Sequence, residues 1–349
     1  MNTTMNPIDR VLTQVRKVVL GYESMTELVA YAMIADGHAM LTGVPGLAKS
    51  VTANAFRRAI RGSTSSRFQM TPNTMPSDIV GSEVLNRKTN EFEVRLGKIF
   101  ANTVLADEIN RTSPRTQAAL LEAMAEKSTS IAGTTYPMPE LFCVLATRNP
   151  LEQEGTYPLP EAQLDRFLFE MNMPYAPREA EKQMLRQQNI LRGKDPYAPI
   201  DPNQSLSVEE MLEVRRLVRD IHVSDAALEY ILTLVRTTRP DEKEFKDFLT
   251  ANQNDANVQK FGQSMEVGGS PRAEQALLAA SQVRAFHMGR DFVLPEDLLY
   301  VLFPVLGHRI IFNRRAKMDK KYKAVDAITT LGAKVEFHKN LKDYEPKRS

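Results

Sequence analysis

The chain has 349 residues, of which 42% are hydrophobic and 25% are charged, and its formal net charge is +2. These values are typical of a soluble globular protein with one large domain or two ordinary ones. The small net charge argues against nucleic acid as the main partner, and the single cysteine, Cys143, excludes an intrachain disulfide. Without a long apolar run or an apolar leader segment, we expect a cytoplasmic protein with no membrane span.

Short apolar runs that alternate with helical patterns predict a parallel α/β sheet buried on both faces. The expected strands lie near residues 38–42, 67–70, 103–106, 141–147 and 167–173. Two further segments, 84–94 and 128–138, surround turn residues and predict β-hairpins inserted in this pattern. Ser113 and Pro114 predict a helix start, because serine caps a first turn and proline fits its first position.

The pattern after residue 175 is helical. We therefore expect an α/β core over residues 1–175, a small all-helical lid domain over 176–312 and a basic C-terminal extension over 313–349. Ser207 and Glu210 have the spacing of a capping box. Residues 240–269 are polar and predict a long loop or a weak helix. The basic residues that open the extension are typical either of a solvated surface or of a docking patch for an acidic partner.

The segment GVPGLAKS, residues 43–50, matches the phosphate-binding pattern G-x-x-x-x-G-K-[ST] except at one position. Alanine replaces its second glycine, and we expect Ala48 to take helical dihedrals there. An apolar strand precedes the loop and a helical pattern follows it, which is the context of a phosphate cradle built from backbone N–H groups. The alternative is a turn that contains Lys-Ser by coincidence. The candidate nucleotide-binding residues are Gly43, Pro45, Gly46, Leu47, Ala48, Lys49, Ser50 and Val51.

The segment VLADEINR ends an apolar strand in two carboxylates, Asp107 and Glu108. A magnesium-nucleotide site needs one acid beside the metal and another to orient or deprotonate the attacking water. We assign Asp107 and the Ser50 hydroxyl to the metal and Glu108 to the water. The alternative is a solvent-facing acidic turn.

Three further polar residues are catalytic candidates. Asn149 follows an apolar strand and would face the γ-phosphate if that strand lies between the first and third; it would otherwise be a turn residue before proline. Arg166 precedes a strand and could stabilise transition-state charge on a neighbouring subunit's nucleotide, or else pair with a local acid such as Asp165. Arg272 lies in the first turn of a helix, where the dipole disfavours cations, so contact with a γ-phosphate competes with an ordinary surface position.

These elements, in this order, resemble the MoxR family of AAA+ ATPases over residues 15–312. The resemblance is carried by GVPGLAKS, LADEINR, PRTQAALLEAM, ATRNPLEQEGTYPLPEAQLDRF and GGSPRA. The alanine in the phosphate loop is itself similar to the MoxR form. The resemblance implies the strand order 5-1-4-3-2 and places the two hairpins at the pore or face of a hexamer.

The resemblance also implies a role for each candidate residue. Lys49, Ser50 and Asp107 would bind ATP and Mg²⁺, and Glu108 would be the catalytic base. Asn149 would be sensor 1, Arg166 the arginine finger and Arg272 sensor 2.

The function implied is an ATP hydrolase that works as a ring and remodels or matures partner proteins. Partners in this family often contain a von Willebrand factor A domain. Two alternatives stay open at this point. One is a nucleic-acid motor like the MCM helicases, which share both inserts, and the other is a nucleotide-gated scaffold with little turnover.

Overall fold

The computed structural model describes residues 5–44, 46–150, 156–319, 323–337 and 340–346. The chain divides into two compact units, residues 1–215 and 216–349. Each unit is described by itself. Within the described residues, every helix is too short or too polar to cross a membrane.

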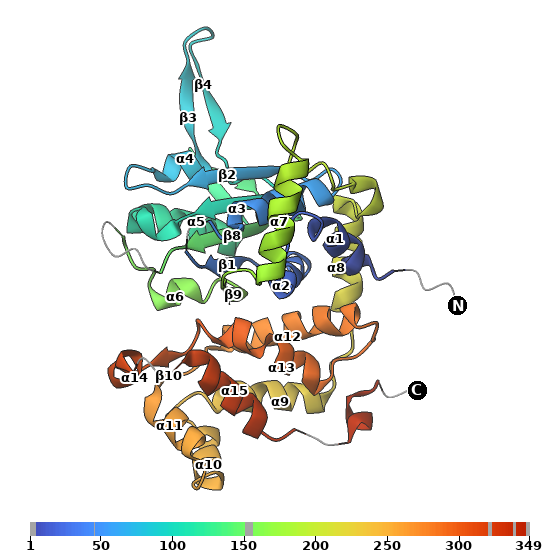
Figure 1. Ribbon diagram of the computed structural model, residues 1–349. Coiled ribbons are helices and arrows are strands. Elements are labelled where there is room, and N and C mark those ends of the chain that lie inside the picture. The colour runs from blue at the N-terminus through green and yellow to red at the C-terminus, as the bar shows by residue number, and fades with distance from the viewer. Residues whose placement is uncertain (1–4, 45, 151–155, 320–322, 338–339, 347–349) are drawn as a thin grey trace. The chain divides into compact units, whose positions relative to one another are not determined.

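A five-stranded parallel sheet forms the centre of the first unit (Figure 1). Its strand order is β2-β5-β8-β1-β9, which confirms the expected order read from the opposite edge. The central strands are buried along almost their whole length, which explains why they read as continuous apolar runs. The strands are β1 (Ala39–Thr42), β2 (Ser65–Gln69), β5 (Thr103–Asp107), β8 (Cys143–Arg148) and β9 (Phe169–Asn172).

Helices cover both faces of this sheet. On one face, α3 (Lys49–Ala59) packs against β5 and carries α1 (Pro7–Val15), which in turn contacts α2 (Glu23–Ile34). On the other face, an apolar cluster joins the sheet to three helices through residues such as Ile79, Leu120 and Leu164. These helices are α4 (Pro76–Val80), α5 (Pro114–Glu126) and α6 (Glu161–Leu164). The remaining elements of this unit are η1 (Ile109–Arg111), α7 (Arg178–Ile190), η2 (Pro202–Gln204) and the first part of α8 (Val208–Arg219).

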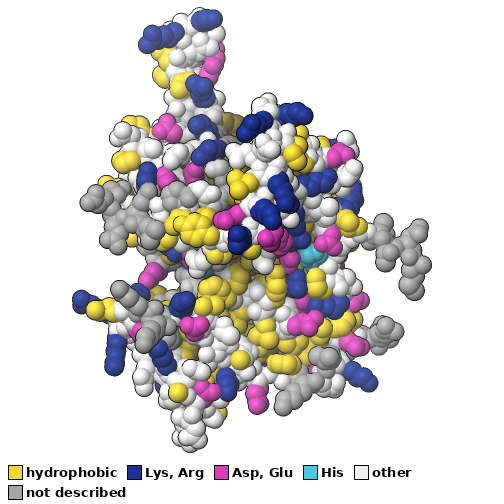
Figure 2. All heavy atoms as spheres, viewed as in Figure 1, with side chains coloured by type: hydrophobic (Ala, Val, Ile, Leu, Met, Phe, Trp, Pro, Cys, Tyr) yellow, Lys and Arg dark blue, Asp and Glu magenta, His cyan; other side chains and the backbone are white. Residues whose placement is uncertain are grey.

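Both expected hairpins are confirmed. The first pairs β3 (Gly81–Asn86) with β4 (Glu91–Leu96), and the second pairs β6 (Ser128–Ile131) with β7 (Thr134–Pro137). Figure 1 shows the β3–β4 hairpin extending far beyond the sheet. Arginine and lysine gather at its far end (Figure 2), where Arg87 and Lys88 form the turn. The Phe92 side chain is 67% exposed along the same hairpin.

Two predicted helix starts are also confirmed. Ser113 caps α5, and its side chain accepts a hydrogen bond from the backbone N–H of Thr116. At the start of α8, the Glu210 N–H donates to Ser207 Oγ at 3.2 Å, and the Ser207 N–H donates to Glu210 Oε2 at 2.7 Å. This reciprocal pair is the capping box that the sequence indicates.

A buried polar network ties the ends of the helices to the edge of the sheet where the strands begin. Arg215 is 5% exposed and pairs with Asp36 at 2.8 Å, while Lys127 pairs with the other oxygen of that carboxylate. Nearby, His38 Nδ1 accepts from the Val144 N–H, and its Nε2 lies 3.2 Å from the Met124 carbonyl. Burial lowers the pKa of His38 to about 4, so the ring is held in the neutral form that these two contacts require.

The second unit is mainly helical. It contains α9 (Asp225–Arg236), α10 (Lys243–Ala251), α11 (Ala256–Ser264), α12 (Pro271–His287), α13 (Pro295–Leu306), α14 (Arg314–Met318), α15 (Ala324–Lys334) and η3 (Leu341–Tyr344). One antiparallel pair, β10 (Met265–Val267) with β11 (Ile311–Phe312), joins these helices. The expectation of helices alone therefore missed a short two-stranded sheet.

Of the two alternatives for residues 240–269, the long loop is wrong and the helix is confirmed, because α10 and α11 occupy most of that segment. The apolar residues are few, but they are large and fall on one side of each helix. Phe245, Phe248 and Val258 are buried, and Phe261 is fully buried with its ring 6.1 Å from the rings of Phe245 and Phe248. A few aromatic side chains supply enough buried area to hold two short helices.

Residues beyond 312, expected as a basic extension, pack within the second unit. Ile328 and Leu331 of α15 are buried, and Tyr344 is fully buried close to Tyr230 of α9. Burial together with Tyr344 raises the pKa of Tyr230 to about 12. The first unit likewise continues 40 residues past the expected boundary at residue 175, to Arg215. A boundary at residue 175 between functional domains stays a prediction.

Candidate functional site

The glycine-rich loop connects β1 to α3 at the edge of the sheet where the strands end. The Gly43 N–H donates to the Arg148 carbonyl, so the loop leaves β1 beside the end of β8. Gly46 has a φ of 88° and is exposed. Ala48 was expected to take helical dihedrals, but its φ of 54° and ψ of 13° are left-handed. The reversal that starts α3 requires this conformation, which costs about 1–2 kcal/mol for a residue with a Cβ. Pro45 lies outside the described residues.

The first turn of α3 suits an anion. Among the described residues, no side chain caps this turn and no acidic residue lies in it. The backbone N–H groups and the helix dipole therefore favour a negative ligand such as a phosphate. Lys49 is 8% exposed, and its Nζ donates to the Gly43 carbonyl at 2.9 Å, so the cation is held inside the loop. Ser50 and Val51 follow in the same turn and are half-buried.

Asp107 and Glu108 end β5 beside this loop, and a threonine that the sequence analysis missed connects them. Thr147 Oγ1 donates to Asp107 Oδ1 at 2.6 Å and accepts from the Glu108 N–H at 2.9 Å. Thr147 lies on the neighbouring strand β8 and is completely buried. The single Thr147 hydroxyl therefore fixes the positions of both acidic residues.

Glu108 has a left-handed backbone, with φ of 59° and ψ of 52°. Its carboxylate accepts from Gln69 Nε2 at 2.9 Å and pairs with Arg111 at 3.2 Å. Non-glycine residues in this conformation persist where the surrounding structure fixes them, often at functional sites. The strain at Glu108 and Ala48 therefore marks both sides of the same edge of the sheet.

A cavity of 980 Å³ joins the loop to the two carboxylates. One end is formed by residues 46–51 together with Asp107 and Glu108. The rest of the lining is formed by Val18 and by α7 and the segment after it, and it mixes apolar with polar and basic side chains. The lining residues that the sequence motifs did not predict are Val18, Arg67, Met184, Gln187, Gln188, Leu191, Arg192, Gly193, Lys194 and Pro196. A cavity with a phosphate-binding turn and some apolar lining can accept both the phosphates and the base of a nucleotide.

The donor set also fits magnesium. Among the described residues, no group of three His, Cys, Asp or Glu side chains could hold a metal by itself. Magnesium is commonly bound by one or two carboxylates together with substrate phosphates and water. Asp107 and the Ser50 hydroxyl, on one cavity with an anion-binding turn, are therefore suitable ligands for Mg²⁺ that arrives with a nucleotide.

Asn149 is brought to the same edge of the sheet. It follows β8 directly, is 5% exposed and comes after the Arg148 carbonyl that accepts from Gly43. Since β8 lies between β1 and β5, Asn149 stands between the glycine-rich loop and the acidic strand end.

Arg166 is not brought to this cavity, and Arg272 belongs to the other unit. Arg166 precedes β9, and its Nη1 donates to the Leu121 carbonyl at 2.9 Å, so it lies at the edge where the strands begin. Its Nε is buried and has no hydrogen-bond partner among the described residues. Arg272 belongs to the second unit, in the first turn of α12, where Ser270 caps the helix and the arginine is exposed.

Comparisons with known proteins agree with this geometry. A family model for the ATPase family associated with various cellular activities (AAA) matches residues 38–169, and a model for an AAA lid domain matches residues 262–330. Chaperone MoxR1 of Mycobacterium tuberculosis is 36% identical over 90% of this chain and 78% of its own length. The uncharacterized protein YeaC of Bacillus subtilis is 37% identical over 89% of each chain.

A crystal structure of a candidate ATPase from Cytophaga hutchinsonii superposes with a TM-score of 0.83, at 36% identity over 96% of each chain. The lid match reaches residue 330, so it extends past residue 312, where the resemblance seen in the sequence ended, through α14 and into α15. The similarity covers both units and the motifs that build the cavity. The chain therefore belongs to the MoxR family of AAA+ ATPases.

Proposed function

We propose that the protein is a magnesium-dependent ATP hydrolase that assembles into a ring, most simply a hexamer, and uses hydrolysis to remodel or mature a client protein. The observation that carries the proposal is the meeting of three groups on one 980 Å³ cavity: the first turn of α3 with Lys49, and the carboxylates of Asp107 and Glu108. Phosphate binding, metal binding and water activation each need one of these groups.

In this proposal, the N–H groups of residues 46–50 bind the β-phosphate, and Lys49 moves from the Gly43 carbonyl to the β- and γ-phosphates. Ser50 and Asp107 would hold Mg²⁺, which would supply positive charge next to the phosphate oxygens. Val18 and Leu191 offer apolar contacts for the base.

Glu108 is the proposed general base. Its left-handed backbone and its contact with Gln69 hold the carboxylate at the cavity wall, from where it can accept a proton from the attacking water. Asn149, between the loop and the acidic strand end, would orient that water and the γ-phosphate.

The position of Arg166 supports the proposal of a ring. It lies at the edge of the sheet opposite to its own cavity, so it can serve as a finger only for the nucleotide of a neighbouring subunit. A contact of that kind is head-to-tail, and head-to-tail contacts close into rings. Arg272 would contact a γ-phosphate from the lid, in its own subunit or in the next.

The client is proposed by family analogy alone. The relative from Mycobacterium tuberculosis is named a chaperone. A protein with a von Willebrand factor A domain is the first candidate client. Neither a nucleic-acid motor nor a nucleotide-gated scaffold is favoured by a specific observation.

The proposal is tested with Glu108→Gln, matched by Glu122→Gln, which changes an exposed glutamate on α5 away from the cavity. We expect Glu108→Gln to lower the rate of ATP hydrolysis by about 10²-fold or more while it still binds ATP, because only the base is lost. Hydrolysis would be measured by phosphate release and assembly by light scattering with and without ATP. Hydrolysis at the wild-type rate would contradict the role of Glu108, and no ATP binding by the wild type would contradict the function.

A second experiment tests the shared site. Arg166→Ala subunits keep an intact cavity, and Glu108→Gln subunits keep an intact arginine. In a mixture of the two variants, some interfaces combine the intact cavity of an Arg166→Ala subunit with the Arg166 of a Glu108→Gln subunit. Hydrolysis is therefore expected to reappear. If no activity returns at any mixing ratio, Arg166 does not act on a neighbouring subunit.

A further inference from the structure

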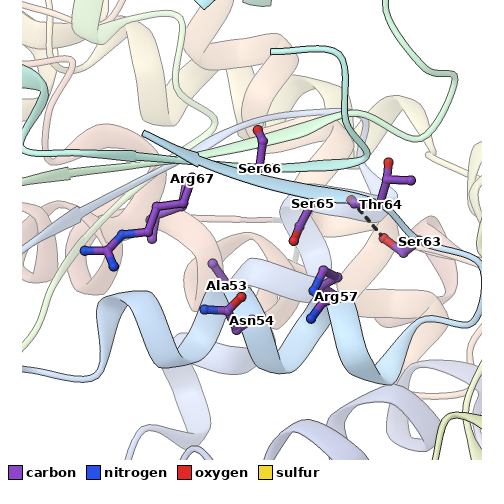
Figure 3. A pocket seen from close by; sticks show the side chains of 9 residues that line it. Ala53, Asn54, Arg57, Ser63, Thr64, Ser65, Ser66 and Arg67 are labelled. Carbon is purple, nitrogen blue, oxygen red and sulfur yellow. Dashed lines mark hydrogen bonds between the residues drawn. The ribbon is translucent and has the colours of Figure 1, made fainter. Parts of the chain in front are cut away.

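Arg67 lies at the candidate site, and neither the sequence motifs nor the roles proposed above include it. It lies in the middle of β2, the edge strand of the sheet, and its register partner on β5 is Leu105. Its guanidinium Nη2 donates to Asp107 Oδ2 at 2.8 Å. Figure 3 shows the Arg67 side chain extended away from Ser63 and Arg57.

The two oxygens of Asp107 are therefore shared between two donors. Oδ1 accepts from the buried Thr147 hydroxyl, and Oδ2 accepts from Arg67. A magnesium ion that uses this carboxylate, directly or through a bound water, draws on the same two oxygens, and it is repelled by the arginine charge at this range. The Arg67 guanidinium and a magnesium ion would therefore use the same Asp107 carboxylate.

We propose that Arg67 competes with magnesium for the Asp107 carboxylate and so lowers the affinity of the site for the metal-nucleotide complex. The proposal rests on the function proposed above and adds a residue that regulates its metal. Arg67 is a positioning residue here, since it acts through Asp107.

The Arg67 side chain has space to move away from Asp107. Its side chain is 52% exposed, whereas that of Asp107 is 12% exposed, so the arginine is the mobile partner of the pair. It also lines a second cavity, of 530 Å³, between β2 and α3. Hydroxyl and amide groups of Ser65, Ser63 and Asn54 line that cavity and offer acceptors for a guanidinium (Figure 3). Exchange of Arg67 for a metal ion therefore needs no unfolding of the strand.

The experiment compares Arg67→Gln with Arg57→Gln. Arg57 lines the second cavity but not the first, so its substitution removes the same charge from the same side of the sheet without touching the metal carboxylate. Binding of Mn²⁺ to the protein saturated with ADP would be followed by the electron paramagnetic resonance signal of free Mn²⁺. Affinity for a fluorescent ATP analogue would be measured in Mg²⁺ and in EDTA.

We expect Arg67→Gln to bind Mn²⁺ about fivefold more tightly than the wild type, the size of a partly exposed ion pair, with little change in nucleotide affinity in EDTA. Arg57→Gln should leave both values within about twofold of the wild type. Arg67→Lys, which keeps the charge but not the planar fork, should fall between wild type and Arg67→Gln.

Unchanged or weaker Mn²⁺ binding by Arg67→Gln would overturn the proposal; if nucleotide affinity in EDTA fell as well, Arg67 would instead be a phosphate ligand. A wild type that binds no nucleotide in either condition would refute the proposed function itself, which is a separate result. If Arg67→Gln did not fold, the Arg67→Lys titration would decide, and Mn²⁺ affinity below that of the wild type would count against competition.

Discussion

The two edges of the central sheet are built in opposite ways. At the edge where the strands begin, Arg215 and His38 are buried, and each has partners that suit its charge, with Arg215 paired to Asp36. At the edge where the strands end, Asp107 is paired with a half-exposed arginine, and Glu108 is held in a left-handed conformation. The first edge secures the fold, whereas the second keeps groups ready for a ligand.

The role of left-handed backbone conformations distinguishes the two edges more clearly than the polarity of their side chains does. Asp36 and Lys127 also have positive φ, at 61° and 49°. They follow or end helices, where a left-handed residue is the usual way to stop the helix. Ala48 and Glu108 precede helical turns instead, so their conformation does not stop a helix, and both residues line the cavity. Substitutions at the first edge should therefore change stability, and those at the second should change ligand binding and hydrolysis.

The largest expected effect is at Arg215. Arg215→Met should lower the free energy of unfolding by about 3–5 kcal/mol, because it leaves Asp36 and the carbonyls of Met33 and Glu140 without their buried donor. Arg216→Met, at the exposed neighbour, is the control. Urea unfolding measures both, and equal stability of the two variants would show that the network contributes little.

The next effect is a dependence of stability on acid. The pKa of His38 is about 4 in the folded protein and near 6.5 in an unfolded chain, so the unfolded state takes up the proton first as the pH falls. Stability is complete above pH 6.5 and decreases by about 3 kcal/mol as the pH falls towards 4. Unfolding of wild type and His38→Gln between pH 7 and 4 measures this difference, and the variant should lose part of the slope.

Thr147→Val tests the edge with the carboxylates. Loss of the hydroxyl removes one donor to Asp107 and one acceptor of the Glu108 N–H, so stability should fall by about 1–3 kcal/mol. ATP hydrolysis should fall more than this, because both carboxylates lose their alignment. Thr147→Ser, which keeps the hydroxyl, should retain most activity; similar rates in the two variants would argue against alignment by Thr147.

The smallest effect is expected at Ala48. Ala48→Gly should stabilise the protein by about 0.5–1 kcal/mol, since glycine adopts the left-handed conformation without strain. Ala118→Gly, at an exposed position within α5, should destabilise by a similar amount. Thermal unfolding of both variants checks the opposite signs, and destabilisation by Ala48→Gly would mean that the loop is not strained.

Much of this architecture could be predicted from local patterns. Continuous apolar runs indicate the buried strands, and Ser113 with Pro114 indicates the start of α5. The sequence failed where long-range contacts decide. The left-handed conformation of Ala48 follows from the path of the loop, and the pairing of Arg67 with Asp107 follows from strand register. Thr147 looks like an ordinary strand residue until β8 is placed beside β5. For residues 243–264 the sequence left a loop and a weak helix open, because a few aromatic residues replace a regular apolar stripe.

The helix α8 runs unbroken across the division between the two units. Ser207 and Glu210 cap its first turn, and the Arg215 side chain forms an ion pair with Asp36. The part of this helix up to Arg215 is therefore fixed to the first unit. Within that unit, the candidate site and this anchor lie at opposite ends of the same parallel strands, so the central sheet connects them directly.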